Sequence, residues 1–108
     1  MAKERMTPLA RKEQLLCAAL TVAERVGYNK LNRLMIVAEL GGNITDGLVS
    51  RYFGQRHSLR QAVLHAGIHR GNLTILAQGL ALGDPTARAA PKDLRKAAAD
   101  QVKAWEAA

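Results

Sequence analysis

Apolar residues recur every three or four positions in the first part of the chain, the spacing that places side chains on one side of a helix. The pattern follows Thr7-Pro8, where threonine can cap free backbone N–H groups and proline fits the first helical position. It ends at Gly27, a residue that closes many helices. The sequence therefore predicts an amphipathic helix over residues 8–26. Its apolar positions are Leu9, Leu16, Ala19, Leu20, Ala23 and Val26.

Two shorter helices are predicted after this one. Asn32 is a suitable N-cap for a helix that ends at Gly41-Gly42, and Thr45 for a helix that continues to about Phe53 and ends at Gly54. A support helix followed by two short helices with a glycine-bearing turn is typical of the helix-turn-helix motif. The expected inward positions of the first short helix are Leu34, Val37, Ala38 and Leu40, and the expected contacts among the three helices are Leu31, Ile44, Val49 and Phe53.

A fourth helical pattern begins near Ser58, which forms a possible capping box with Gln61, and stops at Gly83-Asp84-Pro85. Glycines inside this stretch either break the helix or mark places where another backbone comes close, and we favour a break near Gly71-Asn72. Those glycines are Gly67, Gly71 and Gly79.

A last helix follows a predicted loop at 83–91, with Pro91 near its start. Its apolar stripe is Leu94, Ala98, Val102 and Trp105. No stretch alternates like a strand, so the predicted fold class is all-α, with five or six helices. We divide the chain into a helix-turn-helix domain at 1–57 and a helical C-terminal region at 58–108, forming a single compact unit.

Charge is the first indication of function. The chain of 108 residues carries 16 Lys and Arg against nine Asp and Glu, a net charge of +7. Residues 28–72 hold six of the basic and only two of the acidic side chains. A small basic domain most often binds a polyanion, usually nucleic acid.

Composition also bears on other classes of protein. The single cysteine, Cys17, excludes an internal disulfide, and we expect it to be a buried structural thiol. No apolar run is long enough for a membrane span and no signal peptide is recognisable, so we expect a cytoplasmic protein. No catalytic constellation is present, and His65 and His69 lack a third strong ligand, so we expect no enzyme activity, metal or cofactor.

Residues 12–64 resemble the DNA-binding domain of the tetracycline-repressor (TetR) family. The resemblance lies in Leu15–Leu20, Ala23–Tyr28 and Ile36–Gly41, and above all in the segment Gly47-Leu48-Val49-Ser50-Arg51-Tyr52-Phe53-Gly54-Gln55-Arg56. It implies that the third helix enters the major groove of double-stranded DNA. The candidate DNA-binding residues are Asn32, Arg33, Thr45, Asp46, Gly47, Leu48, Ser50, Arg51, Tyr52 and Arg56.

Those residues divide into two groups. One group matches positions at which the family contacts phosphate: Tyr52, Arg56 and the pair Asn32-Arg33. Phosphate contacts fix where the protein sits along the duplex. The residues from Thr45 to Arg51 would meet base edges, and there Asp46 could accept a hydrogen bond from a cytosine amino group. The chain departs from the family pattern at Ser50, at Asp46 and in the longer turn at residues 41–44.

The resemblance implies a transcriptional repressor that binds an inverted-repeat operator as a homodimer. Only about 44 residues follow position 64, too few for the family's usual ligand-binding domain, so we expect no small-molecule effector. Dimerisation would use the C-terminal region. The residues expected at that interface are Gly67, Gly71, Leu73, Leu76, Leu80 and Trp105.

Two other functions stay open at this stage. A non-specific architectural DNA-binding protein would have the same basic charge without preference for an operator. A protein-interaction module that modulates another regulator would be indifferent to DNA.

Overall fold

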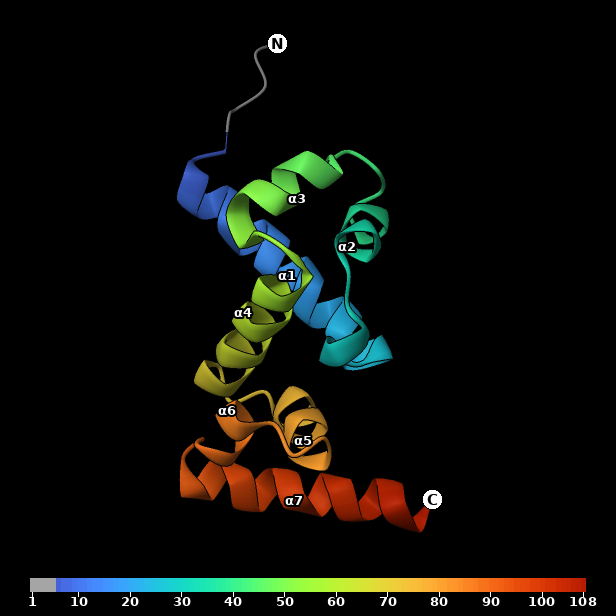
Figure 1. Cartoon of the computed structure of the whole chain (residues 1–108), viewed down its shortest axis with the longest axis vertical. Coiled ribbons are helices and arrows are strands. Elements are labelled where there is room, and N and C mark those ends of the chain that lie inside the picture. Colours follow the sequence, from blue (N-terminus) through green and yellow to red (C-terminus); the bar gives the residue numbers. More distant parts are fainter. Residues whose placement is uncertain (1–5) are drawn as a thin grey trace.

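The computed structural model describes residues 6–108, and all regular structure in that range is helical (Figure 1). This confirms the predicted all-α class. The elements are α1 (Pro8–Val26), a 3-10 turn η1 (Tyr28–Lys30), α2 (Arg33–Glu39), α3 (Asp46–Phe53), α4 (Arg56–His69), α5 (Leu73–Ala81), α6 (Pro85–Arg88) and α7 (Lys92–Ala107). The described chain has one α-helix more than the five or six predicted, because the expected loop at 83–91 contains the one-turn helix α6.

Side-chain caps begin the first three helices, as the sequence predicts. Thr7, Asn32 and Thr45 each accept a hydrogen bond from the backbone N–H three residues later, at 3.0–3.1 Å. Gly27 and Gly54 end α1 and α3 with positive φ angles of 98° and 71°. The turn between α2 and α3 contains Gly41 and Gly42, both also with positive φ.

Three local predictions are wrong. Of the predicted inward positions of α2, Val37 and Leu40 pack partly against the core, but Leu34 is 67% exposed and Ala38 is also exposed. The fully buried residue of this helix is Ile36. A helix of only two turns can bury one narrow stripe, and contact with α1 selects the stripe around Ile36. Cys17 is exposed on α1 and is not a buried thiol.

The third error concerns the start of α4. This helix begins at Arg56, two residues before the predicted Ser58, and has no side-chain cap. Gln61 does not return to Ser58; instead its amide contacts Asp84 and Thr86. The Gln61 side chain, which a capping box would require, is therefore used in a tertiary contact. Local sequence cannot reveal such a contact.

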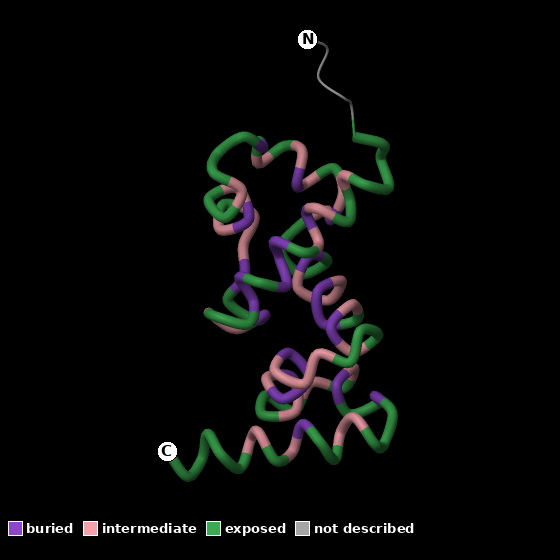
Figure 2. The backbone as a smooth tube through the Cα atoms, turned by 180° about the vertical axis from the view of Figure 1, so that it is seen from behind, coloured by how far each residue is buried: buried purple, intermediate pink, exposed green. Residues whose placement is uncertain are grey.

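Two hydrophobic clusters hold the helices together. The first joins α1, α2, α3 and α4 and reaches α5 at Ile75. The second joins α5, α6 and α7 around Leu76, Ala77 and Ala98. In Figure 2 the buried segments run through the centre of the molecule, while α7 is mostly exposed along its outer side. Side chains on both sides of residue 57 share the first cluster, because Leu59 and Val63 of α4 belong to it; the division at that residue stays a prediction.

Both readings of the interior glycines are correct, at different positions. The helix breaks at Gly71, which has a φ of +69° and separates α4 from α5. Gly67 and Gly79 are places of close approach: an added Cβ at Gly67 would lie 2.8 Å from the Ile75 side chain, and one at Gly79 would lie 2.6 Å from the Cβ of Ala87.

Polar contacts join the end of α1 to the C-terminal helices. The Tyr28 hydroxyl donates to Asp84 at 2.8 Å, and Gln78 both accepts from the Tyr28 backbone N–H and donates to the Ala23 carbonyl, at 2.9 Å each. Burial, together with the Asp84 carboxylate, raises the pKa of Tyr28. The molecule is elongated, with extents of 52 × 24 × 24 Å, and α3 and α7 lie at opposite ends (Figure 1).

In the described range, the helices are all too short or too polar to span a bilayer.

Candidate nucleic-acid interface

Helix α3 buries one side and exposes the other. Val49 and Phe53 are buried in the first hydrophobic cluster, and Leu48 and Tyr52 pack partly against it. Thr45, Gly47 and Arg51 are exposed, and Ser50 is half-buried. One side of α3 is therefore open to a ligand, while Leu48 and Tyr52, like Ser50, are half-buried.

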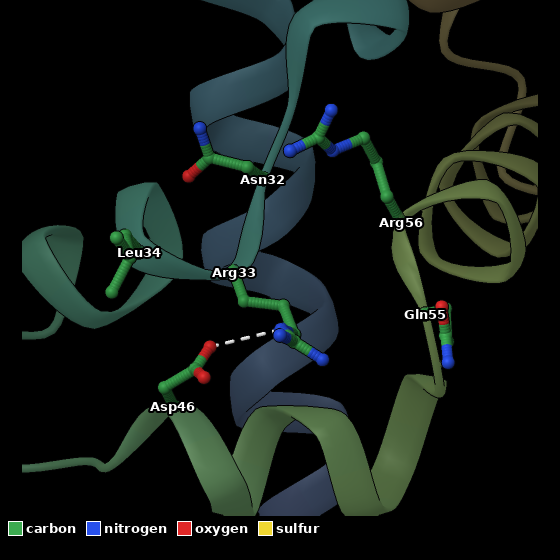
Figure 3. Close-up of a pocket in the computed structure, with 6 residues that line it drawn as sticks. All are labelled: Asn32, Arg33, Leu34, Asp46, Gln55 and Arg56. Atoms are coloured by element: carbon green, nitrogen blue, oxygen red, sulfur yellow. Dashed lines mark ion pairs between the residues drawn. The ribbon is translucent and has the colours of Figure 1, made fainter.

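The starts of α2 and α3 are joined by an ion pair. The Nε of Arg33 lies 2.9 Å from a carboxylate oxygen of Asp46 (Figure 3). The side chain of Asn32 is occupied in the helix cap, since its oxygen accepts the N–H of Met35. Three of the predicted DNA-binding residues therefore lie together at this junction, two of them in contact with each other.

A surface cavity of about 520 Å³ separates this junction from the start of α4. Figure 3 shows Arg56 and Gln55 on the α4 side, with Asn32, Arg33 and Asp46 opposite them. Arg56 is exposed, and no described acidic side chain lies within ion-pair distance of it or of Arg51. The cavity is thus bordered by cationic groups that can receive an anionic ligand.

Two residues of this region were missed from the sequence. Gln55 lines the cavity, and Arg60 donates its Nε–H to the Leu31 carbonyl at 3.0 Å. Arg60 thereby holds α4 against the segment that leads into α2. Arg60 lies one helical turn after Arg56, and this spacing could have indicated that the two share one side of α4. The sequence alone does not show that the Arg60 side chain turns inward.

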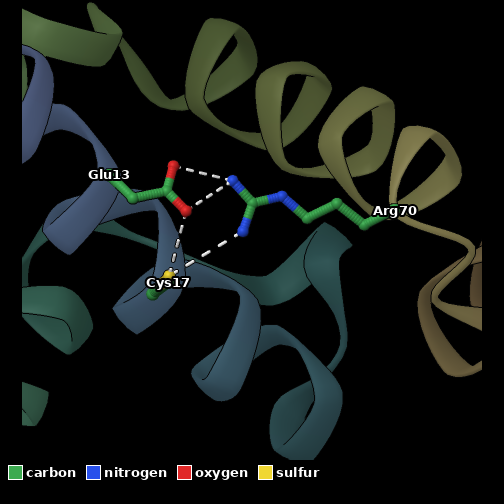
Figure 4. A network of polar contacts seen from close by, with 3 residues as sticks. All are labelled: Glu13, Cys17 and Arg70. Carbon is green, nitrogen blue, oxygen red and sulfur yellow. Dashed lines mark hydrogen bonds and ion pairs between the residues drawn. The ribbon is translucent and has the colours of Figure 1, made fainter.

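A second polar cluster lies on the side of α1 and α4. One terminal nitrogen of Arg70 lies 2.8 Å from both carboxylate oxygens of Glu13, and the Cys17 thiol lies 3.4 Å from Glu13 and 3.8 Å from Arg70 (Figure 4). The hydrogen bond from Arg70 lowers the pKa of Glu13. This contact joins α1 to the end of α4 and lies outside the surface formed by α2, α3 and the start of α4.

The residues expected at a dimer interface differ in their accessibility. Gly67 and Leu76 are buried inside the chain and have no surface for a partner. Leu73 and Leu80 are half-buried, while Gly71 is exposed and Trp105 is 44% exposed. A shallow groove between α5 and α7 is lined by the apolar residues Leu80, Ala99 and Val102 and by the charged residues Lys92, Arg95, Lys96, Lys103 and Glu106.

Comparison with known proteins gives one informative similarity. The chain is 31% identical over 75 residues to the HTH-type transcriptional regulator BetI of Vibrio atlanticus (strain LGP32). The match covers 69% of this chain but 36% of that regulator, so the chain spans about a third of the length of the curated relative. No family model matches the sequence, and no solved structure matches it. The similarity supports a helix-turn-helix domain like that of a transcriptional regulator.

Proposed function

We propose that this protein is a sequence-specific DNA-binding transcriptional repressor that reads double-stranded DNA with α3. The observation that carries the proposal is the exposed side of α3, which carries Arg51 and is followed by Arg56 at the start of α4, in a helix-turn-helix arrangement. Among the described residues, neither arginine has an acidic side chain within ion-pair distance. A helix of this width fits the major groove, and cations beside it bind the phosphates that border the groove. The similarity to an HTH-type transcriptional regulator supports the coarser part of this proposal, a DNA-binding regulator.

The accessible residues have distinct roles in this proposal. Thr45, Gly47, Ser50 and Arg51 face base edges, and Leu48 contributes a partly exposed apolar contact. Arg33 and Arg56 bind phosphates from opposite sides of the cavity, and the Tyr52 hydroxyl adds a further phosphate contact. Asn32 acts mainly by capping α2, which fixes the position of Arg33.

Two copies would bind an inverted repeat, with their α3 helices in successive major grooves about 34–36 Å apart. The part of the predicted interface that is open to a partner is Gly71, Leu73, Leu80 and Trp105. Occupying a promoter is sufficient for repression, so the proposal includes no small-molecule effector. We also propose that the protein acts in the cytoplasm, because its DNA target would be there.

The experiment is selection of bound sites from a random duplex pool, followed by mobility-shift titrations. We expect an enriched inverted repeat. Arg56→Ala should weaken binding about tenfold on every sequence and reduce the slope of log K against log salt by about 1.8, because each of the two bound copies loses one phosphate contact. Arg51→Ala should also relax preference at one base position.

Arg88→Ala is the matched control, because it removes the same charge from the exposed part of α6. It should leave affinity nearly unchanged. Equal affinity for selected and scrambled duplexes would instead indicate an architectural DNA-binding protein. Absence of any DNA binding would leave the protein-interaction module as the better explanation.

A further inference from the structure

We propose that Asp46 is a positioning residue that orients Arg33 toward a DNA phosphate, and that it does not read a base. This inference rests on the proposed DNA-binding function. It concerns an acidic side chain that the sequence places, unexpectedly, on the surface that should meet a polyanion. The inference is based on the ion pair between Asp46, at the start of α3, and Arg33, at the start of α2.

The geometry of the contact leaves most of the guanidinium free. A carboxylate oxygen of Asp46 lies 2.9 Å from the Nε of Arg33 in an ion pair, and this contact does not involve the N–H groups of the two terminal nitrogens. The two terminal nitrogens keep four N–H groups, and Figure 3 shows one of these nitrogens pointing away from Asp46. A phosphate accepts two parallel hydrogen bonds from such a group, so a fixed guanidinium is better prepared to bind it than a mobile one.

The place of the pair explains why such a restraint is useful. Arg33 is the first residue of α2 and Asp46 the first of α3, and the chain between α2 and α3 passes through Gly41 and Gly42. Ile44 anchors the later part of this turn in the first hydrophobic cluster, but Gly41 and Gly42 are exposed and an added Cβ at Gly42 would meet nothing within 4 Å. The ion pair therefore supplies a direct link between the two helix starts.

Stability alone does not account for the pair. The side chains of Arg33 and Asp46 are 34% and 45% exposed, and ion pairs with that much contact with water contribute little to folding. An unpaired carboxylate here would also repel the phosphates beside α3. Pairing with Arg33 removes much of that repulsion and gives the acidic group a role that agrees with DNA binding.

The test is a double-mutant cycle on the selected duplex, with Asp46→Ala, Arg33→Ala and the double variant. With Arg33 present, Asp46→Ala should weaken binding about threefold to tenfold, because the guanidinium loses its orientation. With Arg33→Ala already in place, the same change should leave binding equal or make it tighter, because only a repulsive charge is removed. Dependence of the Asp46→Ala effect on the presence of Arg33 is a result that a general loss of folding would not produce, and circular dichroism checks folding in parallel.

A second measurement separates positioning from base reading. Asp46→Asn removes the negative charge but keeps an oxygen beside the Arg33 guanidinium, so we expect partial rescue of affinity and an unchanged preferred sequence. If Asp46 read cytosine, asparagine would shift the preference toward adenine at one position. That shift, weaker binding after Asp46→Ala in both backgrounds, or tighter binding with Arg33 present would each overturn the inference. Failure of the unchanged protein to bind any duplex would instead overturn the proposed function.

Discussion

Replacing Gly79 with alanine is expected to lower the free energy of unfolding by about 2 kcal/mol, because the new methyl group has no space. Its Cβ would lie 2.6 Å from the Cβ of Ala87 and 3.2 Å from a Leu64 methyl. The Ala87 Cβ is fixed directly to the backbone of α6, so the whole helix must move away from α5. The gain in helix propensity, about 1 kcal/mol, offsets only part of this cost. Thermal unfolding followed by circular dichroism should show a midpoint lower by roughly 10 °C.

Gly47→Ala provides the matched control for this prediction. Gly47 also lies within a helix, but its nearest neighbour to an added Cβ is the Thr45 hydroxyl oxygen at 4.0 Å. The substitution should therefore leave the unfolding midpoint unchanged or raise it slightly. If the two variants had the same stability, α5 and α6 would not be in the close contact that the structure gives them.

Asp84→Ala should destabilise the fold by about 2–3 kcal/mol, because one carboxylate holds three elements. It accepts the Thr86 N–H at 2.9 Å, which caps α6, and the Tyr28 hydroxyl at 2.8 Å, and it also contacts Gln61 of α4. The loss would leave the buried Tyr28 hydroxyl, and the half-buried Gln61 and Thr86, without this acceptor. Chemical denaturation should show a lower midpoint, and Tyr28→Phe should reproduce part of the loss. A variant as stable as the unchanged protein would contradict this role.

The same carboxylate gives stability a defined dependence on pH. Burial alone would raise the pKa of Asp84, but hydrogen bonds from Tyr28, the Thr86 N–H and Gln61 outweigh it, so the pKa is lowered. A lowered folded-state pKa means that the contribution is complete above the ordinary aspartate pKa, near 4, and is lost as the pH falls through the folded-state value. The difference in unfolding free energy between the unchanged protein and Asp84→Asn should therefore shrink below about pH 4. A difference that stayed constant from pH 6 to pH 2 would contradict the assignment.

Much of the fold was predictable because its helix ends depend on local chemistry. Thr7, Asn32 and Thr45 have side chains that cap the helix following them, and Gly54 and Gly71 take the positive φ angles that end one. Such signals require only neighbouring residues. The all-helical class and the order of the helices follow from them and from the apolar spacing.

The errors have a common origin in tertiary contacts. Leu34 is as apolar as Ile36, yet only contact with the other helices decides which of them is buried. Gln61 suits a capping box but is used by Asp84 and Thr86, and Cys17 lies beside Arg70, 53 residues later in the chain. The same limit applied to the site: Arg33 and Asp46 were recognised separately, but their contact could not be read from positions 13 residues apart. The roles of the DNA-binding residues stay predictions.

The elongated shape limits how two copies could share one operator. The described chain is 52 Å long, whereas successive major grooves on one side of a duplex lie only about 34–36 Å apart. Two protomers joined tail to tail in a straight line would hold their α3 helices too far apart for adjacent grooves. The pair would have to be folded into a V, with its apex at the α7 end. The angle of that V would then set the number of base pairs between half-sites, so a change remote from the bases could alter which operator is bound.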